Sequence, residues 1–270
     1  MLARLLLCCM LLSTIPAQVA LAAPRGDAGC GQLHVSFFEF GALYYRDASG
    51  NWAGIDKDIV DELARRLGCR FTTDIDSRVR IWTQMAQDRL DMATSGISTP
   101  EREQHAQIVP YMTDRNYVLM RPEAAARVDS MDSFLATPEY KVAVIKSFKH
   151  GVIYDAWLDK LRAQGRVYET SDYNTLLRLF RLGRVDAVLM LGVSWLPSVR
   201  QEQVEHRYRL LDWAPGDNFV AGLVLSRRRV PPASVARFRS TIQAMRQDGT
   251  LQAIFARHVG PELAAAMVNY

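Results

Sequence analysis

The sequence predicts an α/β fold of two lobes, in which each lobe is a mainly parallel sheet flanked by helices. The first observation is that expected strands and helices alternate in the first half of the chain, over residues 33–38, 55–67, 70–74, 79–88 and 90–93. The second is that residues 141–191 repeat this alternation. Such an order favours parallel sheets with right-handed crossovers, which bind ligands beyond the carboxyl ends of their strands.

The N-terminus has the pattern of a secretion signal. Arg4 precedes an apolar run over residues 5–12, Pro16 interrupts the segment, and Ala20-Leu21-Ala22 has the spacing of a cleavage site. We therefore expect residues 1–22 to be a signal peptide that is removed on export to the periplasm. No later stretch approaches the roughly 18 apolar residues that a membrane helix needs.

The composition bounds the number of domains and the class of partner. About 247 residues remain after the signal, enough for one large domain or two medium domains. The formal net charge of +4 falls to +3 when Arg4 is lost. This charge is too weak and too scattered to indicate nucleic-acid binding, and we interpret the basic run over residues 227–229 as a solvated loop. We expect a monomer.

Two cysteines remain after the signal. Cys30 and Cys69 each precede an expected strand, the strands over residues 33–38 and 70–74. If these strands are parallel neighbours, their starting ends are adjacent and a disulfide between the two cysteines is possible in an oxidising compartment. The alternative is a pair of unrelated buried thiols.

The first helix has a clear apolar face. Ile55, Ile59, Leu63 and Leu67 recur four apart, and Gly68 follows as a terminator. Before it, two short aromatic pieces flank a turn at residues 47–51. Acidic residues at the helix start, Asp56 and Asp58, complement the helix dipole, and catalysis by this pair is the weaker interpretation.

The most informative stretch covers residues 90–102. An apolar strand ends in small polar residues, including Ser95 and Gly96, and Thr99-Pro100-Glu101-Arg102 has the pattern of a helix start. The glycine allows close approach of a ligand to the backbone, and Arg102 supplies a planar fork for a carboxylate. The alternative is an ordinary turn in which Thr99 caps a helix and Arg102 lies in solvent.

The second half has the same local pattern. Residues 87–92 and 181–187 are both a helix end, a basic turn and a strand that opens with an apolar residue and an aspartate. The C-terminal segment, residues 235–256, is expected to be helical with an interruption at Asp248-Gly249. We expect the C-terminal helices to return to the N-terminal lobe.

Four segments in this order resemble the bacterial extracellular solute-binding proteins of family 3, which feed polar amino acids to ABC importers: residues 54–59, 90–102, 183–188 and 248–254. The resemblance implies a type II periplasmic-binding-protein fold with two hinge crossovers, near residues 117–121 and 216–221. It implies a first lobe of residues 24–118 with 221–270 and a second lobe of residues 119–220. The ligand would be trapped between the lobes by hinge closure.

The resemblance also implies the ligand site. Arg102 falls on the family's carboxylate-binding arginine, and Gly96 and Ser98 fall near the positions that complete that pocket. Because one residue is missing between them relative to the usual pattern, Ser95 could share the role of Ser98. The resemblance further implies an aromatic wall at Phe40, and at Arg78 a charged residue in place of a stacking aromatic. It implies a basic loop at Lys146 and Ser147. Met190 or Leu191 falls where many amino-acid receptors carry the aspartate that binds the ligand's ammonium group.

The sequence therefore predicts a periplasmic solute-binding protein, not an enzyme, that captures a small anionic carboxylate ligand. Its partner would be an ABC permease or a sensor receptor in the inner membrane. The rival is an enzyme similar to the secreted cyclohexadienyl dehydratases, with Glu39 or Glu101 transferring protons.

Two sets of residues are expected to be structural, and no metal or cofactor is predicted. Histidines that lack metal-ligand spacing are read as surface or loop residues, although His150 could reach the cleft: His34, His105, His150, His206 and His258. Tryptophans are read as core or hinge residues: Trp52, Trp82, Trp157, Trp195 and Trp213.

Overall fold

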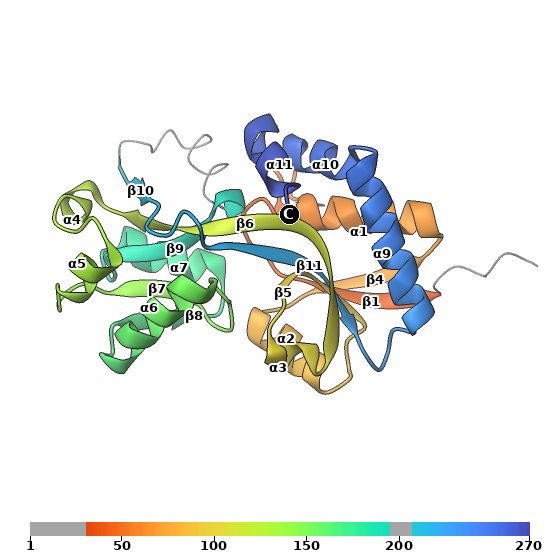
Figure 1. Cartoon of the computed structure of the whole chain (residues 1–270), viewed down its shortest axis with the longest axis horizontal. Coiled ribbons are helices and arrows are strands. Elements are labelled where there is room, and N and C mark those ends of the chain that lie inside the picture. The colour runs from red at the N-terminus through yellow and green to blue at the C-terminus, as the bar shows by residue number, and fades with distance from the viewer. Residues whose placement is uncertain (1–30, 195–206) are drawn as a thin grey trace, which may run out of the picture.

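Two lobes joined by two long strands make up the computed structural model, which describes residues 31–194 and 207–270 (Figure 1). The connecting strands are β6 (Ala106–Met120) and β11 (Asn218–Ser226). The expected signal peptide, Cys30, Trp195 and His206 lie outside the described residues.

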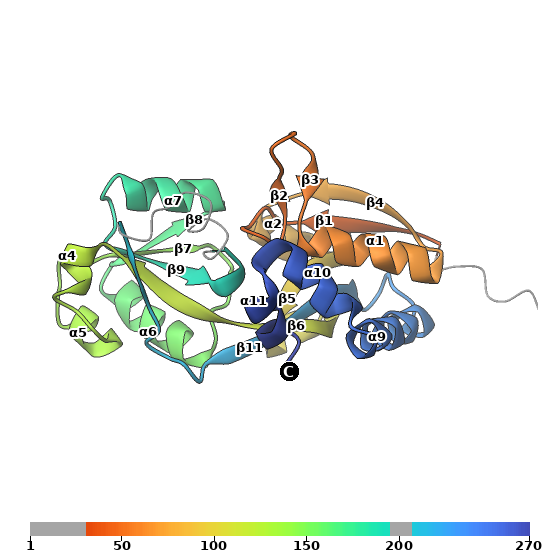
Figure 2. The same cartoon turned by 90° about the horizontal axis from the view of Figure 1, so that it is seen from above.

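The N-terminal lobe is an α/β unit that the chain leaves and later re-enters. Before the crossing, it contains β1 (Gln32–Phe37), β2 (Tyr45–Arg46), β3 (Trp52–Ala53), α1 (Ile55–Leu67), β4 (Arg70–Ile75), α2 (Arg78–Ala86), β5 (Met92–Ile97) and α3 (Pro100–Glu103). After β11, the chain adds α9 (Pro232–Gln247), α10 (Thr250–Val259) and α11 (Pro261–Met267). Helices α9 and α10 contact α1, and α9 and α11 contact β6, so the expected return of the C-terminal helices is confirmed (Figure 2).

The second lobe is continuous in sequence. It contains α4 (Pro122–Ala125), α5 (Met131–Leu135), β7 (Val142–Ile145), α6 (Val152–Ala163), β8 (Val167–Thr170), α7 (Tyr173–Arg181), β9 (Ala187–Leu191) and β10 (Arg209–Leu211). Its aromatic core includes Phe134, whose ring centroid lies 5.2 Å from that of Trp157 and 6.1 Å from that of Trp213. These two tryptophans pack in the core as expected.

One sheet runs through both lobes, in the order β4-β1-β5-β11-β6-β9-β7-β8, with β10 also on β6. The outer strands pair in parallel, β1 with β4 and β5, and β7 with β8 and β9. The connecting strands β6 and β11 pair antiparallel with their neighbours. The predicted α/β fold of two lobes flanked by helices is therefore confirmed, with antiparallel pairing along β6 and β11, between β10 and β6, and in a separate two-stranded sheet of β2 and β3.

The crossing in β6 occurs without a loop. Residues up to Arg115 pair with β11, whereas residues from Asn116 onward pair with β9. The change of partner lies just before the crossover expected at residues 117–121. The sequence does not mark its position, because a continuous strand contains no turn residue. The predicted lobe boundaries at 118/119 and 220/221 fall inside β6 and β11, and the division itself stays a prediction.

Helix α1 matches its predicted bounds. Ile55, Ile59 and Leu63 are fully buried on one face, and Gly68 ends the helix in a left-handed conformation with its N–H on the Ala64 carbonyl at 2.9 Å. The turn before α1 uses Gly54 at a φ of 131°, where an added Cβ would lie 2.4 Å from the Leu43 carbonyl oxygen. The sequence pattern and the backbone geometry therefore agree for this helix.

The starting ends of β1 and β4 are adjacent. Gln32 pairs with Arg70, and the Arg70 N–H donates to the Gly31 carbonyl at 3.0 Å. Cys69 therefore lies just before the start of β4, beside the end at which β1 begins. We expect peptide mapping without reductant to find Cys30 linked to Cys69, and reduction to lower the free energy of unfolding by about 3 kcal/mol by freeing the unfolded chain. Two free thiols in oxidised, folded protein would contradict this prediction.

In the part of the chain that the structure describes, no helix is both long enough and apolar enough to cross a membrane.

Candidate functional site

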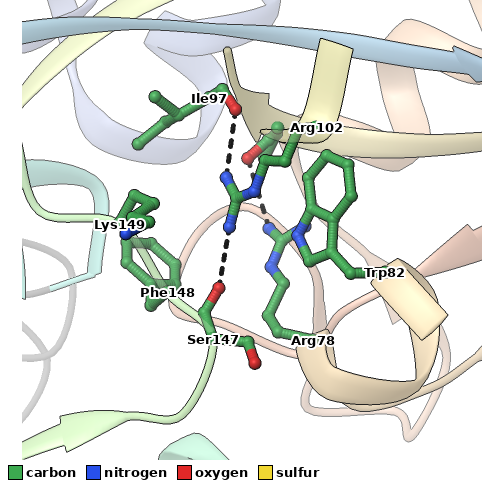
Figure 3. A pocket seen from close by; sticks show the side chains of 9 residues that line it. Arg78, Trp82, Ile97, Arg102, Ser147, Phe148 and Lys149 are labelled. Atoms are coloured by element: carbon green, nitrogen blue, oxygen red, sulfur yellow. Dashed lines mark hydrogen bonds between the residues drawn. The ribbon is translucent and has the colours of Figure 1, made fainter. Parts of the chain in front are cut away.

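A small cavity lies where the two lobes meet. The N-terminal lobe contributes Arg78, Trp82, Ser95, Gly96, Ile97 and Arg102, and the loop after β7 contributes Ser147, Phe148 and Lys149 (Figure 3). Its volume is about 10 Å³, roughly the space of one water molecule. The lobes must therefore separate, or the lining side chains must move, before the cavity can take a larger molecule.

Arg102 bridges the two lobes. Thr99 accepts the Arg102 backbone N–H at 3.2 Å and caps α3, so the predicted helix start is confirmed. The guanidinium donates through Nη1 to the Ile97 carbonyl at 3.0 Å and through Nη2 to the Ser147 carbonyl of the second lobe at 2.8 Å. It also lies over the Trp82 ring, 4.1 Å from its centroid. The alternative that Arg102 lies free in solvent is therefore wrong.

The charge of Arg102 is maintained although the side chain is largely enclosed. Burial is the main cause that lowers its pKa, to about 10, and the nearby Arg78 adds to the shift. The group is still protonated at neutral pH. Its two Nη donors contact carbonyl oxygens from both lobes, and a carboxylate placed between the lobes could accept from the same donors.

Arg78 lies at the first position of α2 and is almost fully buried. Its Nη1 donates to the Thr94 carbonyl at 2.9 Å, and its guanidinium lies over the Phe38 ring at 4.9 Å from the centroid. Its buried Nε has no hydrogen-bond partner in the described structure. Arg78 thus stacks on an aromatic ring at the site where the resemblance placed a stacking aromatic, and it keeps one unsatisfied donor beside the cavity.

A buried carboxylate lies beneath the cavity. Asp56 accepts hydrogen bonds from Ser95 Oγ at 2.8 and 3.0 Å and from the Tyr111 hydroxyl at 2.7 Å. Burial raises the Asp56 pKa, while these donors and the charge of Arg78 lower it. The charges of Asp56 and Arg78 interact and favour the charged form of each group, although burial outweighs this effect on Asp56 and raises its pKa on balance. Its reading as a helix-dipole residue missed this role.

Ser95 faces the protein interior. Its backbone has a φ of +52°, which turns its N–H towards the Tyr111 oxygen at 2.7 Å and its hydroxyl towards Asp56. The hydroxyl is thus committed to the buried network. Ser98, the alternative, is exposed and donates to the Glu103 carboxylate. Both hydroxyls thus have partners within the N-terminal lobe, and of the two residues only Ser95 lines the cavity.

Gly96 lines the cavity for a packing reason. An added Cβ would lie 2.2 Å from Val224 Cγ2 of β11. Because Gly96 has no side chain, β5 and β11 can pack closely together. This packing explains the glycine without any contact to a ligand.

The predicted basic loop lies at the cavity, but a different lysine lines it. Lys146 is exposed and is not among the lining residues, whereas Lys149 is. Ser147 takes part through its carbonyl group, at a φ of +62°. A left-handed residue after β7 turns the chain so that residues 147–149 face Arg102, which spacing alone could not indicate.

Phe40 is a buried contact between the lobes. Its ring centroid lies 5.4 Å from that of Phe148 and 4.9 Å from that of Tyr173, both in the second lobe. It is 3 % exposed and does not line the cavity. Phe148 is the aromatic residue that lines it.

Met190 and Leu191 also lie away from the cavity. They pair with Tyr117 and Asn116 across β9 and β6, and their side chains are buried in the core. The physical reason is that β9 is an interior strand with neighbours on both sides, so its side chains fill the core on both faces.

His150 lies in a loop, as expected, but its side chain is buried. Its Nδ1 lies 2.8 Å from Asn116 Oδ1, and Asn116 Nδ2 donates to the His150 carbonyl at 2.7 Å. Since the amide nitrogen is used on the carbonyl, the amide oxygen must accept, which places the proton of His150 on Nδ1. Burial lowers its pKa to about 3, so this ring is neutral at physiological pH.

Trp82 is a cavity residue that was not expected at the site. Trp82, expected in the core or at the hinge, lines the cavity under Arg102. Its position four residues after Arg78 puts both on one face of α2, a signal that was present in the sequence. Among the described residues, no group of three or more His, Cys, Asp or Glu could hold a metal ion.

Comparison with known proteins identifies the family. Residues 39–261 match the description "Bacterial extracellular solute-binding proteins, family 3". A curated relative, the cyclohexadienyl dehydratase of Pseudomonas aeruginosa, is 32% identical over 90 residues, which are 33% of this chain and 34% of the relative. The chain thus matches about a third of the length of that enzyme.

Solved structures agree on the fold. An ancestral arginine-binding protein bound to arginine has a TM-score of 0.72 at 18% identity, covering 85% of this chain and 99% of that chain. The substrate-binding protein of an ABC uptake transporter from Streptococcus pneumoniae, with bound histidine, has a TM-score of 0.71 at 14% identity, covering 85% and 92%. With a family match over most of the chain and this fold, the chain belongs to the bacterial extracellular solute-binding proteins, family 3.

Proposed function

We propose that this protein captures a small carboxylate-bearing ligand, an amino acid or an organic acid, in the cleft between its lobes and delivers it to an ABC importer. The observation that carries the proposal is the position of Arg102 between the lobes, with Nη1 on the Ile97 carbonyl and Nη2 on the Ser147 carbonyl. A ligand carboxylate can replace one or both carbonyls and form stronger, charge-assisted bonds.

The charges around the cavity favour an anionic ligand. Arg78, Arg102 and Lys149 line it, and Asp56 is the buried acid that compensates Arg78. This balance leaves a net positive cleft, and none of the described residues that line the cavity is an acid that could hold a ligand ammonium group. Because an uncompensated charge is costly when a cleft closes, we expect an acidic amino acid or a plain organic acid to be preferred over lysine or arginine.

Calorimetry of the mature protein tests the ligand class. The panel consists of L-glutamate, L-aspartate, succinate, L-glutamine, L-lysine and L-arginine. We expect at least one anionic member to bind more tightly than the neutral and cationic ones. Tight binding of L-lysine or L-arginine alone would overturn the preference for anions.

Replacing Arg78 tests its share in selectivity. Arg78→Ala should weaken a ligand with two carboxylates more than a ligand with one, because it removes the second positive group from the lining of the cavity. The comparison is the ratio of dissociation constants for L-glutamate and L-glutamine. Arg80→Ala, whose side chain is 73% exposed on the same helix, is the matched control. An unchanged ratio in Arg78→Ala would contradict the proposed role.

A second candidate function is that of a dehydratase, which the 90-residue match to the cyclohexadienyl dehydratase favours. The acids considered for proton transfer, Glu39 and Glu101, do not line the cavity. An assay for conversion of prephenate separates the candidates, since turnover would support the enzyme and binding without turnover would support the receptor.

For location and partners, we propose a periplasmic monomer that carries a cleaved signal at residues 1–22. The partner is the permease of an ABC importer, with a membrane sensor as the alternative. Cross-linking to the permease in native membranes would support transport, and cross-linking to a sensor kinase would support signalling.

A further inference from the structure

Arg78 carries a buried cation that the helix holding it does not explain. It is the first residue of α2, whose first turn contains no acid, and it is only 4 % exposed. The positive end of a helix dipole disfavours a cation at this position. We propose that Arg78 is a specificity-determining residue whose guanidinium fills a cation-binding site in the N-terminal lobe and so keeps cationic ligands out of the cleft. The consequence for ligands rests on the proposed function.

The groups around the guanidinium are those that bind a cation. Its Nη1 donates to the Thr94 carbonyl at 2.9 Å, and its Nη2 donates to the Ser95 carbonyl at 3.4 Å. Its Cζ lies over the Phe38 ring, 4.9 Å from the centroid. Carbonyl oxygens and the face of an aromatic ring both attract positive charge. All three residues belong to the N-terminal lobe, so this site does not depend on how the two lobes are placed.

A buried acid completes the site. Burial lowers the pKa of the Arg78 guanidinium, whereas the charge of Asp56 raises it. Asp56 is held in place by other groups, because it accepts from Ser95 Oγ at 2.8 Å and from the Tyr111 hydroxyl at 2.7 Å. Removal of the Arg78 side chain would therefore leave two carbonyls, a ring face and a buried carboxylate around an empty space. A buried carboxylate without a counter-ion is costly, and a cation of the same shape would relieve that cost.

The filled site gives the expected preference for anions a second cause besides net charge. The guanidinium also lies over the ring of Phe148, a cavity residue of the second lobe, 5.9 Å from the centroid (Figure 3). A cationic ligand in the cavity would meet the charge of Arg78 where these rings and carbonyl oxygens would otherwise attract it. Arg78 thus acts against cationic ligands both by repulsion and by filling the place that would bind them.

Chemical rescue of Arg78→Ala tests whether the site binds a guanidinium cation. Methylguanidinium chloride at millimolar concentration should raise the melting temperature of this variant to a plateau, as expected for a ligand that binds the folded state. N-methylurea, which is similar in shape but uncharged, should have no such effect. Arg80→Ala is the matched control, because Arg80 lies on the same helix with a side chain that is 73% exposed. Neither this control nor the wild type should be stabilised.

Two further measurements test the acid and the ligand. Asp56→Asn combined with Arg78→Ala should lose the rescue, because the carbonyls and the ring remain but the buried negative charge is removed. In Arg78→Ala alone, calorimetry should show that the affinity for L-arginine relative to L-glutamate rises by about tenfold or more over the wild type.

The filled site and the ligand class can fail separately. If methylguanidinium stabilises folded Arg78→Ala no more than Arg80→Ala, the inference is wrong. Rescue without binding of any amino acid or organic acid of the panel would uphold the filled site and count against the proposed function. Rescue with an unchanged relative affinity for L-arginine would overturn the role in specificity. If Arg78→Ala does not fold alone, refolding in methylguanidinium should recover more soluble protein than refolding in N-methylurea, and equal yields would overturn the inference.

Discussion

Arg102→Ala is expected to abolish ligand binding. A carboxylate held between the lobes would lose its bidentate partner and stay desolvated, which costs about 2–5 kcal/mol, or roughly 30-fold to several thousand-fold in the dissociation constant. Arg102→Lys should recover only part of this loss, because an ammonium group keeps the charge but lacks the planar fork. Isothermal titration calorimetry with the best ligand of the panel measures both.

A loss of binding must be separated from a loss of structure. Arg102 also holds the Ser147 carbonyl of the second lobe, so its removal weakens closure. The melting temperature of the ligand-free variant, measured beside that of Arg80→Ala, shows how much stability is lost with the two hydrogen bonds to carbonyls and the contact with the Trp82 ring. Unchanged affinity in Arg102→Ala would exclude it as the carboxylate anchor.

Asp56→Ala is expected to destabilise the protein by about 3–5 kcal/mol. The substitution leaves Arg78 buried without a compensating charge, and it removes the acceptor for Ser95 and Tyr111. Chemical unfolding measures the change. Tyr111→Phe, which removes one donor, should cost about 1 kcal/mol.

A double substitution separates charge from packing. If Asp56 compensates Arg78, then Asp56→Ala with Arg78→Ala should be less destabilised than the sum of the single variants. Asp61→Ala, an exposed acid of the same helix, is the control for loss of negative charge. A loss in Asp56→Ala no larger than that in Asp61→Ala would contradict the compensation of Arg78 by Asp56.

The elements that could be predicted from the sequence are those with local signals. Helix α1 has a regular apolar face and a terminal glycine, and α3 has Thr99 and Pro100 at its start. Strand β6, by contrast, was missed although it is 15 residues long. Its first part pairs with β11 and its last part with β9. Its side chains therefore pack in two different lobes and give no single alternating pattern, and Pro110 interrupts the pattern further.

The site was predictable where one segment carries the chemistry. Arg102 follows from residues 90–102, since its cap and its carbonyl partner Ile97 lie within five residues. Asp56 could not be recognised in this way, because its donors Ser95 and Tyr111 are 39 and 55 residues away. Leu191 was placed at the site by resemblance, but β9 continues into the core and keeps its side chain there.

The pairing of β6 with β11 makes the second lobe an insertion in a β-hairpin. Arg115 lies opposite Asn218, so the chain leaves and re-enters the N-terminal lobe at neighbouring positions of one sheet. The entropy of closing a loop rises only by about 0.6 kcal/mol for each doubling of its length. A folded second lobe already holds its own two ends together, so the N-terminal lobe carries an insertion of this size at little thermodynamic cost.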